Sequence, residues 1–306
     1  MSTLRYQVWS SLELIPLGKV TTYGMLARFV GTKAIRAVAS WVAKNPQAPK
    51  IPCHRVVLAN GRVGQYSGVG GVRQKIKLLK KEGIRISASG QVVELERYLF
   101  DFDFSYLTYG KTDLVLASAS PRRQALLSSL KLKFQTIPAL IDESQFTKLS
   151  VQSQVEQLAL AKAKHVANSI DRPVKVVGAD TLVEFKGQAL GKPKNATEAR
   201  IMLTKLSGQK VEVFSGLAVV GVKFTEKGKK HLITQSSTSR VQVKLKPLSQ
   251  KIIDWYVATG EPLDKAGAFA IQGQGATLIE EIMGDYFAVV GLSLKQLVDM
   301  LQKMRK

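Results

Sequence analysis

The pattern of the sequence changes near residues 106–111, and this change constrains the fold more than any single motif does. Residues 1–106 carry 16 Lys and Arg residues against 6 Asp and Glu residues. From Asp113 onward, strand-like and helix-like stretches alternate, which predicts an α/β domain. A chain of 306 residues also exceeds what one hydrophobic core normally serves. We therefore expect two domains, residues 1–106 and residues 107–306, and an α/β fold class overall.

The composition is that of an ordinary soluble globular protein, with 45% hydrophobic and 22% charged residues. No run approaches the roughly 18 consecutive apolar residues of a transmembrane helix, and the first residues lack the apolar segment of a signal peptide. One cysteine permits no internal disulfide, and three histidines leave little material for a zinc site. We expect a cytoplasmic protein with no membrane partner.

Basic residues dominate the first third of the chain. Between Lys19 and Arg85 there are 14 basic residues and a single acid, Glu82. Such a distribution is typical of a polyanion-binding face, although a solvated surface that serves solubility explains the charge equally well. The charge alone leaves both interpretations open.

Two short helices are predicted within this basic stretch, over residues 23–30 and 33–43, with a turn at Gly31 between them. Thr22 and Thr32 are suitable N-caps for these helices. Two helices joined by a glycine turn form the helix-turn-helix pattern, and the basic residues of the second helix favour a DNA-binding interpretation. A helix over residues 72–82 and a strand over residues 91–95 complete the expected elements of this region.

The only cysteine, Cys53, is followed directly by His54 and Arg55. A nearby cation lowers the pKa of a thiol from its free value of roughly 8.5 and raises the fraction of nucleophilic thiolate. A lone cysteine is otherwise most often a small buried hydrophobic residue. If the chain is extended here, neighbouring side chains point to opposite sides.

Residues 5–97 resemble the C-terminal, DNA-binding half of 6-O-methylguanine-DNA methyltransferases. The matching segments are residues 15–24, 36–38, 45–46, 51–57, 63–68 and 78–83. The resemblance implies a winged helix-turn-helix-like alkyltransferase domain that needs no cofactor and acts on double-stranded DNA with alkylated guanine. It implies that Cys53 accepts the alkyl group, that His54 deprotonates the thiol through a water, and that Glu82 orients the imidazole.

The same resemblance implies a set of DNA-binding residues. Arg36 would replace the flipped base in the stack, and Tyr23 would press on the phosphate backbone. Asn45 would support the turn before the active site. The remaining members of the set are Arg55, Tyr66 and Ser67.

Two departures from this family keep alternatives open. Its usual N-terminal partner domain is not present, and residues 83–92 look more like alkyltransferase-like proteins, which bind alkylated guanine without repairing it. The domain is therefore either an alkyltransferase or a non-catalytic lesion sensor. A third interpretation, a transcriptional helix-turn-helix regulator, leaves the segment around Cys53 without a role.

The second domain carries a candidate anion site. Residues 118–123 join a predicted strand to a predicted helix, with Pro121 suited to the first helical position. Free amides at that helix start, together with Arg122 and Arg123, predict phosphate binding, although a capped helix start with surface arginines gives the same pattern. Asp180 follows the apolar stretch 174–178, where ligands commonly lie in α/β sheets and where a simple capping role is also common.

Residues 113–303 resemble the Maf family of nucleoside triphosphate pyrophosphatases. The matching motifs are residues 117–123, 142–143, 158–163, 178–181, 191–193, 206–208, 256, 260–267, 270–273, 284–286 and 289–292. The resemblance implies a Maf/ITPase-like mixed α/β domain that hydrolyses dTTP, UTP and modified pyrimidine nucleotides to the monophosphate and pyrophosphate. It also allows a homodimer through this domain. One departure, Ser293 where a proline commonly stands, lies away from the expected chemistry.

This second resemblance implies site residues as well. Asp180 would accept the proton of the attacking water, and Glu143 with Asp180 would hold Mg²⁺ or Mn²⁺. The phosphates would be bound by Arg123, Lys162 and Lys192, and Ser120 is a further substrate-binding residue. The residues that accompany the dTTP/UTP branch of the family are Arg122, Thr181 and Gln272. The whole chain is thus predicted to be a bifunctional fusion whose N-terminal domain transfers the alkyl group to Cys53. The alternative is that this domain only binds lesions and that the Maf domain alone is an enzyme.

Overall fold

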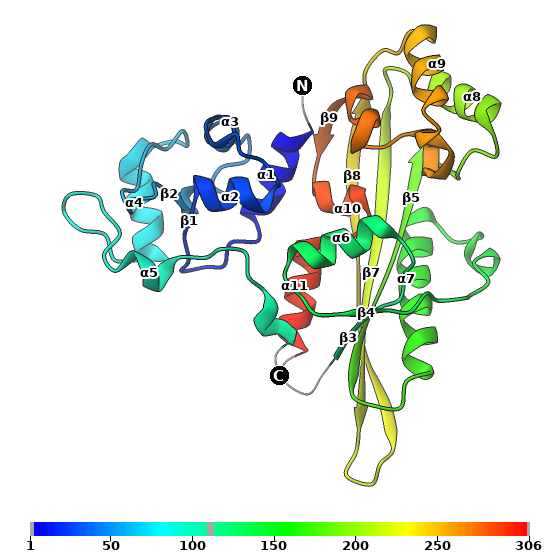
Figure 1. Cartoon of the computed structure of the whole chain (residues 1–306), viewed down its shortest axis with the longest axis horizontal. Helices are drawn as coiled ribbons and strands as arrows, with labels where there is room; N and C mark the ends of the chain where they lie inside the picture. Colours follow the sequence, from blue (N-terminus) through cyan, green and yellow to red (C-terminus); the bar gives the residue numbers. More distant parts are fainter. Residues whose placement is uncertain (1–2, 109–112, 305–306) are drawn as a thin grey trace. The chain divides into compact units, whose positions relative to one another are not determined.

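The computed structural model describes residues 3–108 and 113–304 and divides the chain into two compact units. We call Leu4–Asp103 the N-terminal unit, and Phe104–Lys306 with Met1–Thr3 the C-terminal unit (Figure 1). The domain boundary expected near residues 106–111 falls partly on residues 109–112, which lie outside the described residues. None of the helices in the described ranges combines the length and apolar character that a bilayer crossing requires.

The N-terminal unit is mostly helical. Its helices are α1 (Leu4–Leu12), α2 (Tyr23–Phe29), α3 (Ile35–Ala43), α4 (Gly71–Lys81) and α5 (Leu95–Tyr98), with a 3₁₀ turn η1 (Cys53–Arg55). Two short strands, β1 (Thr21–Thr22) and β2 (Val56–Val57), pair in parallel. A small aliphatic core that includes Val20, Leu79 and Ile84 lies between the strands and α4.

The predicted helix-turn-helix is present as α2 and α3. The Thr22 hydroxyl accepts a hydrogen bond from the Met25 amide at 3.2 Å, which is the N-cap expected of that residue. Gly31 has a φ of +75°, a conformation that glycine adopts without strain. The start of α3 differs from the prediction, because Thr32 bonds the Ala34 amide and the helix begins only at Ile35.

The prediction of a strand over residues 91–95 is wrong. Only isolated bridges form there, between Arg62 and Gln91 and between Ile86 and Val92. Glu94 has a φ of +55°, which turns the chain out of an extended path, and α5 begins at Leu95. The local left-handed conformation therefore ends the pairing before a strand is established.

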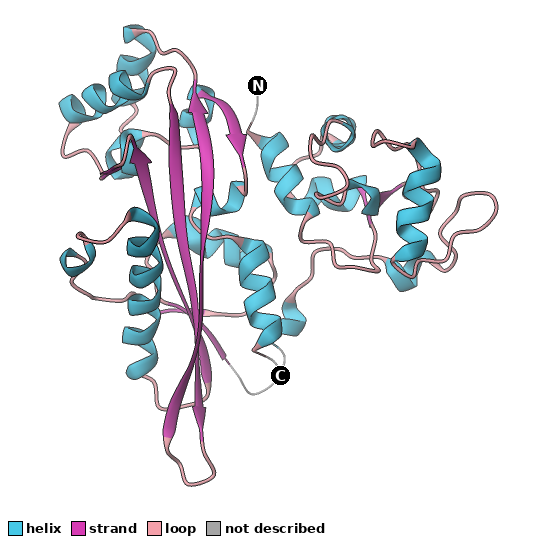
Figure 2. Cartoon of the chain, turned by 180° about the vertical axis from the view of Figure 1, so that it is seen from behind, coloured by secondary structure: helices cyan, strands magenta, loops and turns pink. Residues whose placement is uncertain are grey.

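The C-terminal unit is built on a seven-stranded mixed sheet in the order β4-β3-β5-β7-β8-β9, with β6 paired to β5 (Figure 2). The strands are β3 (Asp113–Leu116), β4 (Gln135–Thr136), β5 (Val174–Phe185), β6 (Gln188–Leu190), β7 (Lys210–Phe224), β8 (Lys230–Leu245) and β9 (Ile279–Met283). Strand β3 pairs in parallel with β4 and β5, and the other pairs are antiparallel. The mixed α/β fold predicted from the sequence is confirmed.

The helices of this unit are α6 (Pro121–Ser129), α7 (Val151–Asn168), α8 (Ala196–Leu206), α9 (Gln250–Ala258), α10 (Tyr286–Val290) and α11 (Leu294–Lys303). Short 3₁₀ turns are η2 (Ser105–Thr108), η3 (Ser144–Phe146), η4 (Glu261–Asp264), η5 (Ala266–Ala268) and η6 (Gly273–Leu278). Figure 1 shows α7 on one face of the sheet and α6, α10 and α11 on the other.

Two glycines set how closely α7 approaches the sheet. A Cβ atom at Gly178 would lie 2.1 Å from the Ala159 carbonyl oxygen, and one at Gly216 would lie 2.0 Å from that of Val155. Both distances are far below van der Waals contact, so no other residue fits without moving the helix. The resulting close packing sets the position of the α7 backbone over the sheet, and Lys162 is carried on this helix.

Candidate active sites

The segment around Cys53 forms a 3₁₀ turn. The extended chain considered for this segment from the sequence is therefore not found. The Arg55 amide donates to the Pro52 carbonyl at 3.0 Å, which closes η1 over Cys53–Arg55. With three residues per turn, the thiol and the imidazole point in different directions but not to opposite sides. Cys53 and His54 are both 3% exposed, so the candidate nucleophile and its candidate base lie in a protected environment.

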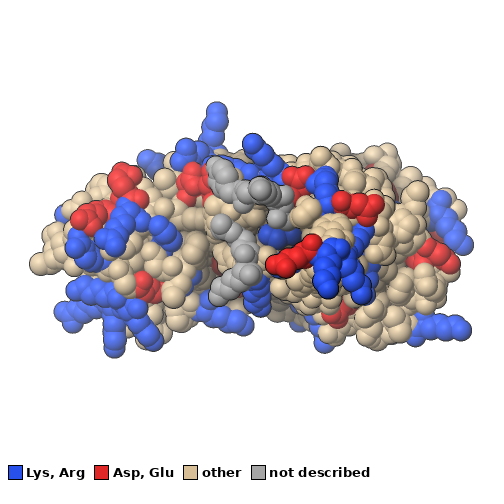
Figure 3. Space-filling model, turned by 90° about the horizontal axis from the view of Figure 1, so that it is seen from below, with Lys and Arg blue, Asp and Glu red and all other residues tan. Residues whose placement is uncertain are grey.

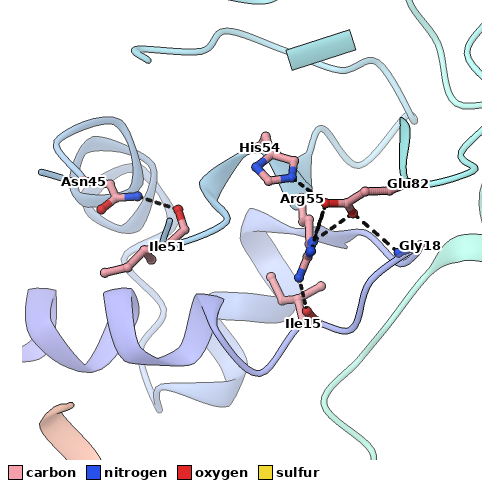
Figure 4. Close-up of polar contacts among 7 residues, drawn as sticks. All are labelled: Ile15, Gly18, Asn45, Ile51, His54, Arg55 and Glu82. Carbon is pink, nitrogen blue, oxygen red and sulfur yellow. Dashed lines mark hydrogen bonds and ion pairs between the residues drawn. The ribbon is translucent and has the colours of Figure 1, made fainter. Parts of the chain in front are cut away.

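Glu82, the C-cap of α4, is the centre of the polar contacts in this unit (Figure 4). Its carboxylate accepts from His54 Nε2 at 2.8 Å, from Arg55 Nε at 2.9 Å and from Arg55 Nη2 at 2.9 Å. Burial by itself raises the pKa of Glu82, but these hydrogen bonds and the charge of Arg55 outweigh it and lower the pKa to about 2. Glu82 is therefore ionised at neutral pH and holds the imidazole in one orientation.

The second ring nitrogen of His54, Nδ1, is not bound by Glu82. Within the described ranges, His54 Nδ1 is buried and has no hydrogen-bond partner. A buried polar atom without a partner is uncommon in folded proteins and marks a place where a water or a substrate atom is expected. Because Glu82 takes Nε2, the nitrogen that remains is the one able to accept a proton.

Tyr23 and Tyr66 lie near Cys53. Burial raises the pKa of each tyrosine, and a negative charge on Cys53 raises it further. Tyr66 is held over Gly68, where a Cβ atom would lie 2.6 Å from the ring. Two predicted residues from different segments are thus brought to the cysteine.

The other predicted DNA-binding residues have different surroundings. Asn45 donates to the Ile51 carbonyl at 2.8 Å and so braces the turn before η1, as Figure 4 shows. The Ser67 hydroxyl donates to the Ala43 carbonyl at the end of α3. Arg36 is exposed on the first turn of α3, in a unit on which Lys and Arg form a cluster at one edge in Figure 3.

Arg55 differs from the other predicted DNA-binding residues. Besides Glu82, its guanidinium donates to the Ile15 carbonyl at 2.7 Å, and its side chain is 15% exposed. These contacts direct the guanidinium into the protein and make it part of the Glu82 cluster. A role of Arg55 toward DNA stays a prediction.

In the C-terminal unit, Asp180 lies within β5 and not after it. The strand runs on to Phe185, because β7 pairs with it as far as Glu184, which lies opposite Glu212. Strand β3 stops earlier, with Leu116 opposite Val177. Asp180 therefore lies just past the carboxyl end of β3.

Lys162 joins two of the predicted acids. Its ammonium contacts Asp180 Oδ1 at 2.6 Å and Glu143 Oε1 at 2.7 Å. Asp180 is 8% exposed and comes from the sheet, whereas Glu143 precedes η3 and is exposed. The two carboxylates thus converge on one positive centre from two different segments.

Arg123 organises the other face of β5. It donates to the Ser118 hydroxyl at 3.1 Å, to the Gly291 carbonyl at 3.0 Å and toward the Thr181 hydroxyl at 3.5 Å. Burial lowers its pKa, with the charge of Asp180 acting in the opposite direction. The sequence predicted Arg123 and Thr181 as site residues. Ser118 was not predicted, although it belongs to the same motif as Arg123, residues 117–123.

The start of α6 agrees with the predicted anion site. Pro121 is its first residue, Ser120 is its N-cap, and the Ser120 side chain makes no capping bond. Arg122 lies 3.8 Å from Asp264 in a largely exposed pair. The amides of this first turn are therefore not capped by the Ser120 hydroxyl and are available to an anion.

Loops carry the remaining predicted residues. Lys192 is exposed, and its loop is attached to η5 by a bond from the Gly267 amide to the Gly191 carbonyl at 3.0 Å. Gln272 is exposed and hydrogen-bonded to the buried Tyr286 side chain. Sequence reasoning did not identify Tyr286 as its partner.

Glu261 orders the loop that follows Gln272. Its carboxylate accepts from the amides of Gln274 at 3.0 Å and Gly275 at 3.2 Å, and from the Tyr256 hydroxyl at 3.3 Å. Glu261 was not predicted as a functional residue, although its motif was quoted for the resemblance.

Both units match the models of known protein families. Residues 113–304 match the family model of Maf-like proteins, and residues 3–84 match that of the 6-O-methylguanine DNA methyltransferase DNA-binding domain. The dTTP/UTP pyrophosphatase of Moorella thermoacetica is 48% identical over 188 residues, which span 61% of this chain and 93% of that protein. The dTTP/UTP pyrophosphatase of Alkaliphilus metalliredigens is 43% identical over 190 residues, 62% and 95% of the two chains.

Among solved structures, S. pombe Atl1 bound to damaged DNA containing O6-carboxymethylguanine is 28% identical. The match covers 33% of this chain and 96% of that one, with a TM-score of 0.29. Both resemblances inferred from the sequence are confirmed by the family models. The chain belongs to the Maf family and carries, ahead of its Maf region, a segment of the alkyltransferase DNA-binding type.

Proposed function

We propose that the C-terminal unit is a nucleoside triphosphate pyrophosphatase that converts dTTP, UTP and modified pyrimidine nucleotides to the monophosphate and pyrophosphate. The observation that carries this proposal is the Asp180–Lys162–Glu143 cluster, in which two carboxylates and an ammonium meet beside β5, just past the end of β3. The names of the two Maf relatives support the substrate class. An anion site at the start of α6 lies on the same unit, as hydrolysis of a triphosphate requires.

A divalent cation, Mg²⁺ or Mn²⁺, fits the residues present. Asp180 and Glu143 supply two carboxylate oxygens that already converge on one cation, the Lys162 ammonium. The described residues contain no group of three or more His, Cys, Asp or Glu that would hold a metal by themselves. Two protein carboxylates with phosphate oxygens and waters form the coordination that Mg²⁺ commonly takes. When bound, the ion would neutralise charge on the phosphates.

Each residue of this site has a proposed role. Asp180, buried and held by Lys162, accepts the proton of the attacking water. Arg123, Lys162, Lys192 and Ser120 bind the phosphates. The pyrimidine is selected by Arg122, Thr181 and Gln272, since the Gln272 amide can both donate to and accept from a pyrimidine edge.

The test uses the full chain with dTTP or UTP and Mg²⁺ or Mn²⁺, followed by separation of the nucleotide products. We expect monophosphate and pyrophosphate, and almost none of either from Asp180→Asn, because an amide cannot take the proton of the water. Release of inorganic phosphate, or faster turnover of purine triphosphates, would contradict the proposal. Lys164→Ala, a change at an exposed lysine on α7, is the matched control.

We propose further that the N-terminal unit transfers the alkyl group of 6-O-alkylguanine in duplex DNA to Cys53. The buried, unpartnered Nδ1 of His54, on a ring fixed by Glu82, carries this proposal. The thiol proton passes through a water to His54, and the Cys53 sulfur bonds to the alkyl carbon. The carbon–oxygen bond breaks, its electron pair stays on the guanine, and a proton completes the restored base. The resulting thioether makes each molecule act once.

DNA contacts follow from the same arrangement. Arg36, exposed at the start of α3, fills the gap left by the flipped base. Tyr23 acts on the backbone, while Tyr66 and Ser67 contact the guanine, and Asn45 supports the turn that presents Cys53. Arg55 is kept as a DNA-binding residue in this proposal, and its guanidinium also holds Glu82.

The full chain incubated with a 6-O-methylguanine duplex tests this second proposal on the DNA side. Digestion of the recovered DNA should show methylguanine replaced by guanine, up to one lesion per protein molecule. Cys53→Ala should bind the same duplex and leave the lesion intact. If the parent protein also binds the duplex and leaves the lesion intact, the unit is a lesion sensor and only the Maf region is an enzyme.

We also propose that residues 1–106 and 107–306 are the two functional domains and that the chain forms a homodimer through the second. Limited proteolysis of the full chain should cut near the boundary and release two protected fragments. Light scattering should give twice the chain mass in solution. A monomer would remove the dimer from the account without affecting either reaction.

A further inference from the structure

Lys162 lies between the two carboxylates that the proposed hydrolysis assigns to a divalent cation. Its ammonium is 2.6 Å from Asp180 Oδ1 and 2.7 Å from Glu143 Oε1. The side chains of Lys162 and Asp180 are 12% and 11% exposed, so this pair is held largely away from water. Two cations on the same pair of oxygens would repel each other strongly where water does not screen them. The two carboxylates therefore serve the ammonium or a metal, but not both at once.

The backbone brings the three side chains together, and only the lysine has a long flexible stem. Asp180 lies on β5, and Lys162 is carried on α7, whose approach to the sheet is set by the two glycines described above. Glu143 lies in a turn that the Asp142 carboxylate closes by accepting from the Ser144 amide at 2.9 Å. The four-carbon stem of a lysine lets the ammonium move while the helix that carries it stays in place.

The charges of the protein at this site already balance. Arg123 is a second counter-charge of the two acids, because burial lowers its pKa and the charges of Asp180 and Glu143 raise it. Two carboxylates thus face two cations, and a divalent ion added alone would bring excess positive charge into a partly buried site. A nucleoside triphosphate supplies the missing negative charge, together with the phosphate oxygens that Mg²⁺ commonly takes beside one or two carboxylates.

We propose that Lys162 keeps Asp180 and Glu143 closed to a divalent cation until a nucleotide draws its ammonium away, so that the substrate of this unit is the metal–nucleotide complex. This inference rests on the proposed pyrophosphatase function and names the form in which metal and substrate enter. The triphosphate oxygens accept from the Lys162 ammonium, which is the phosphate contact proposed above. Asp180 and Glu143 then lose their bridging cation and hold the metal that the nucleotide brings.

Mn²⁺ binding to the full chain, measured by electron paramagnetic resonance of the free ion, tests the proposal with no nucleotide present. We expect weak binding by the parent and binding at least about tenfold tighter by Lys162→Met, because two converging carboxylates lose their bridging charge. Lys162→Arg, which keeps the charge, and Lys164→Met, at an exposed lysine of α7, should bind like the parent. Asp180→Asn added to Lys162→Met should remove the gain, which assigns the ion to this site. Equal affinities of folded Lys162→Met and the parent would overturn the proposal.

A measurement on the parent protein needs no variant that folds without the ammonium. Lysine labelled with ¹³C at Cε gives an NMR signal for Lys162, which is identified by its loss in Lys162→Arg. The probes are Mg²⁺ alone and a dTTP analogue whose α- and β-phosphates are joined by an imido group that resists cleavage. We expect the analogue to shift the Lys162 signal, because the ammonium exchanges carboxylates for phosphates, and Mg²⁺ alone to leave it in place. A shift produced by Mg²⁺ alone would overturn the proposal.

Hydrolysis of dTTP, measured on the same protein, separates this inference from the function on which it rests. If the binding results are as expected and dTTP stays intact, the control of metal entry by Lys162 stands and the pyrophosphatase function fails. If the parent cleaves dTTP but binds Mn²⁺ alone as tightly as Lys162→Met does, the function stands and the control by Lys162 is refuted.

Discussion

Replacement of Glu82 by Gln tests the polar cluster of the N-terminal unit most sharply. The Glu82 side chain is 10% exposed and its pKa falls from 4.5 to about 2. A depression of about two and a half pKa units at 1.36 kcal/mol per unit corresponds to about 3 kcal/mol of folding free energy at neutral pH. Glu82→Gln has nearly the same shape but cannot carry that charge, so we expect it to lose about this amount.

The pH dependence gives the sign of the effect. Because the folded-state pKa of Glu82 lies below its unfolded value, its contribution is complete above the unfolded pKa and is lost as pH falls through about 2. The difference in free energy of unfolding between the parent and Glu82→Gln should therefore narrow on acidification. At pH 3 it should be about 1 kcal/mol.

Urea unfolding followed by tryptophan fluorescence provides the assay. Trp9 and Trp41 lie in the N-terminal unit, and Trp9 donates to the Trp41 carbonyl at 2.7 Å. Trp255, 47% exposed in the C-terminal unit, is replaced by Phe throughout so that the signal reports on the N-terminal unit alone. Glu94→Gln is the matched control, because the Glu94–Arg85 pair is more than half exposed and such pairs contribute little. Equal unfolding of parent and Glu82→Gln at pH 7, or a difference that does not narrow toward pH 3, would refute the reasoning.

Three further changes have distinct expected outcomes. Arg36→Ala should slow alkyl transfer in single-turnover kinetics, because nothing fills the stack after flipping; transfer at the parent rate would remove Arg36 from that role. Gln272→Glu should lower kcat/KM for dTTP more than it weakens inhibition by pyrophosphate, since it changes the group that faces the pyrimidine and leaves the phosphate site intact. Equal losses in both measurements would assign Gln272 to phosphate binding. In Gly178→Ala the new Cβ would lie 2.1 Å from the Ala159 carbonyl oxygen, so α7 should shift and displace Lys162 from Asp180. Both the melting temperature and the rate of pyrophosphate release should fall. A melting temperature equal to that of the parent would contradict the packing argument.

Much of the N-terminal unit could be predicted because its signals are local. The Thr22 cap, the Gly31 turn and the apolar spacing of α4 each act within a few residues. The burial of Lys75, which is 1% exposed, was missed because the basic residues were counted by charge and not by helical position. Its place four residues before Leu79 was the available signal.

The C-terminal unit shows where local signals end. Strand β8 was not expected, since it is rich in Ser and Thr and much of it lacks clear apolar alternation. The length of β5 depends on pairing with β7, a partner distant in sequence, so the apolar stretch alone ended the strand at Gly178. The convergence of Asp180, Lys162 and Glu143 likewise depends on the close approach of α7 at Gly178 and cannot be derived from spacing.

The most direct test of the central claim, that one chain joins a Maf pyrophosphatase to an alkyl-accepting cysteine, is the mass of the intact full-length protein after incubation with excess 6-O-methylguanine duplex. The account predicts the addition of one methyl group, mapped by peptide sequencing to Cys53 and not found in Cys53→Ala. A protein that binds the duplex and keeps its original mass would contradict the claim.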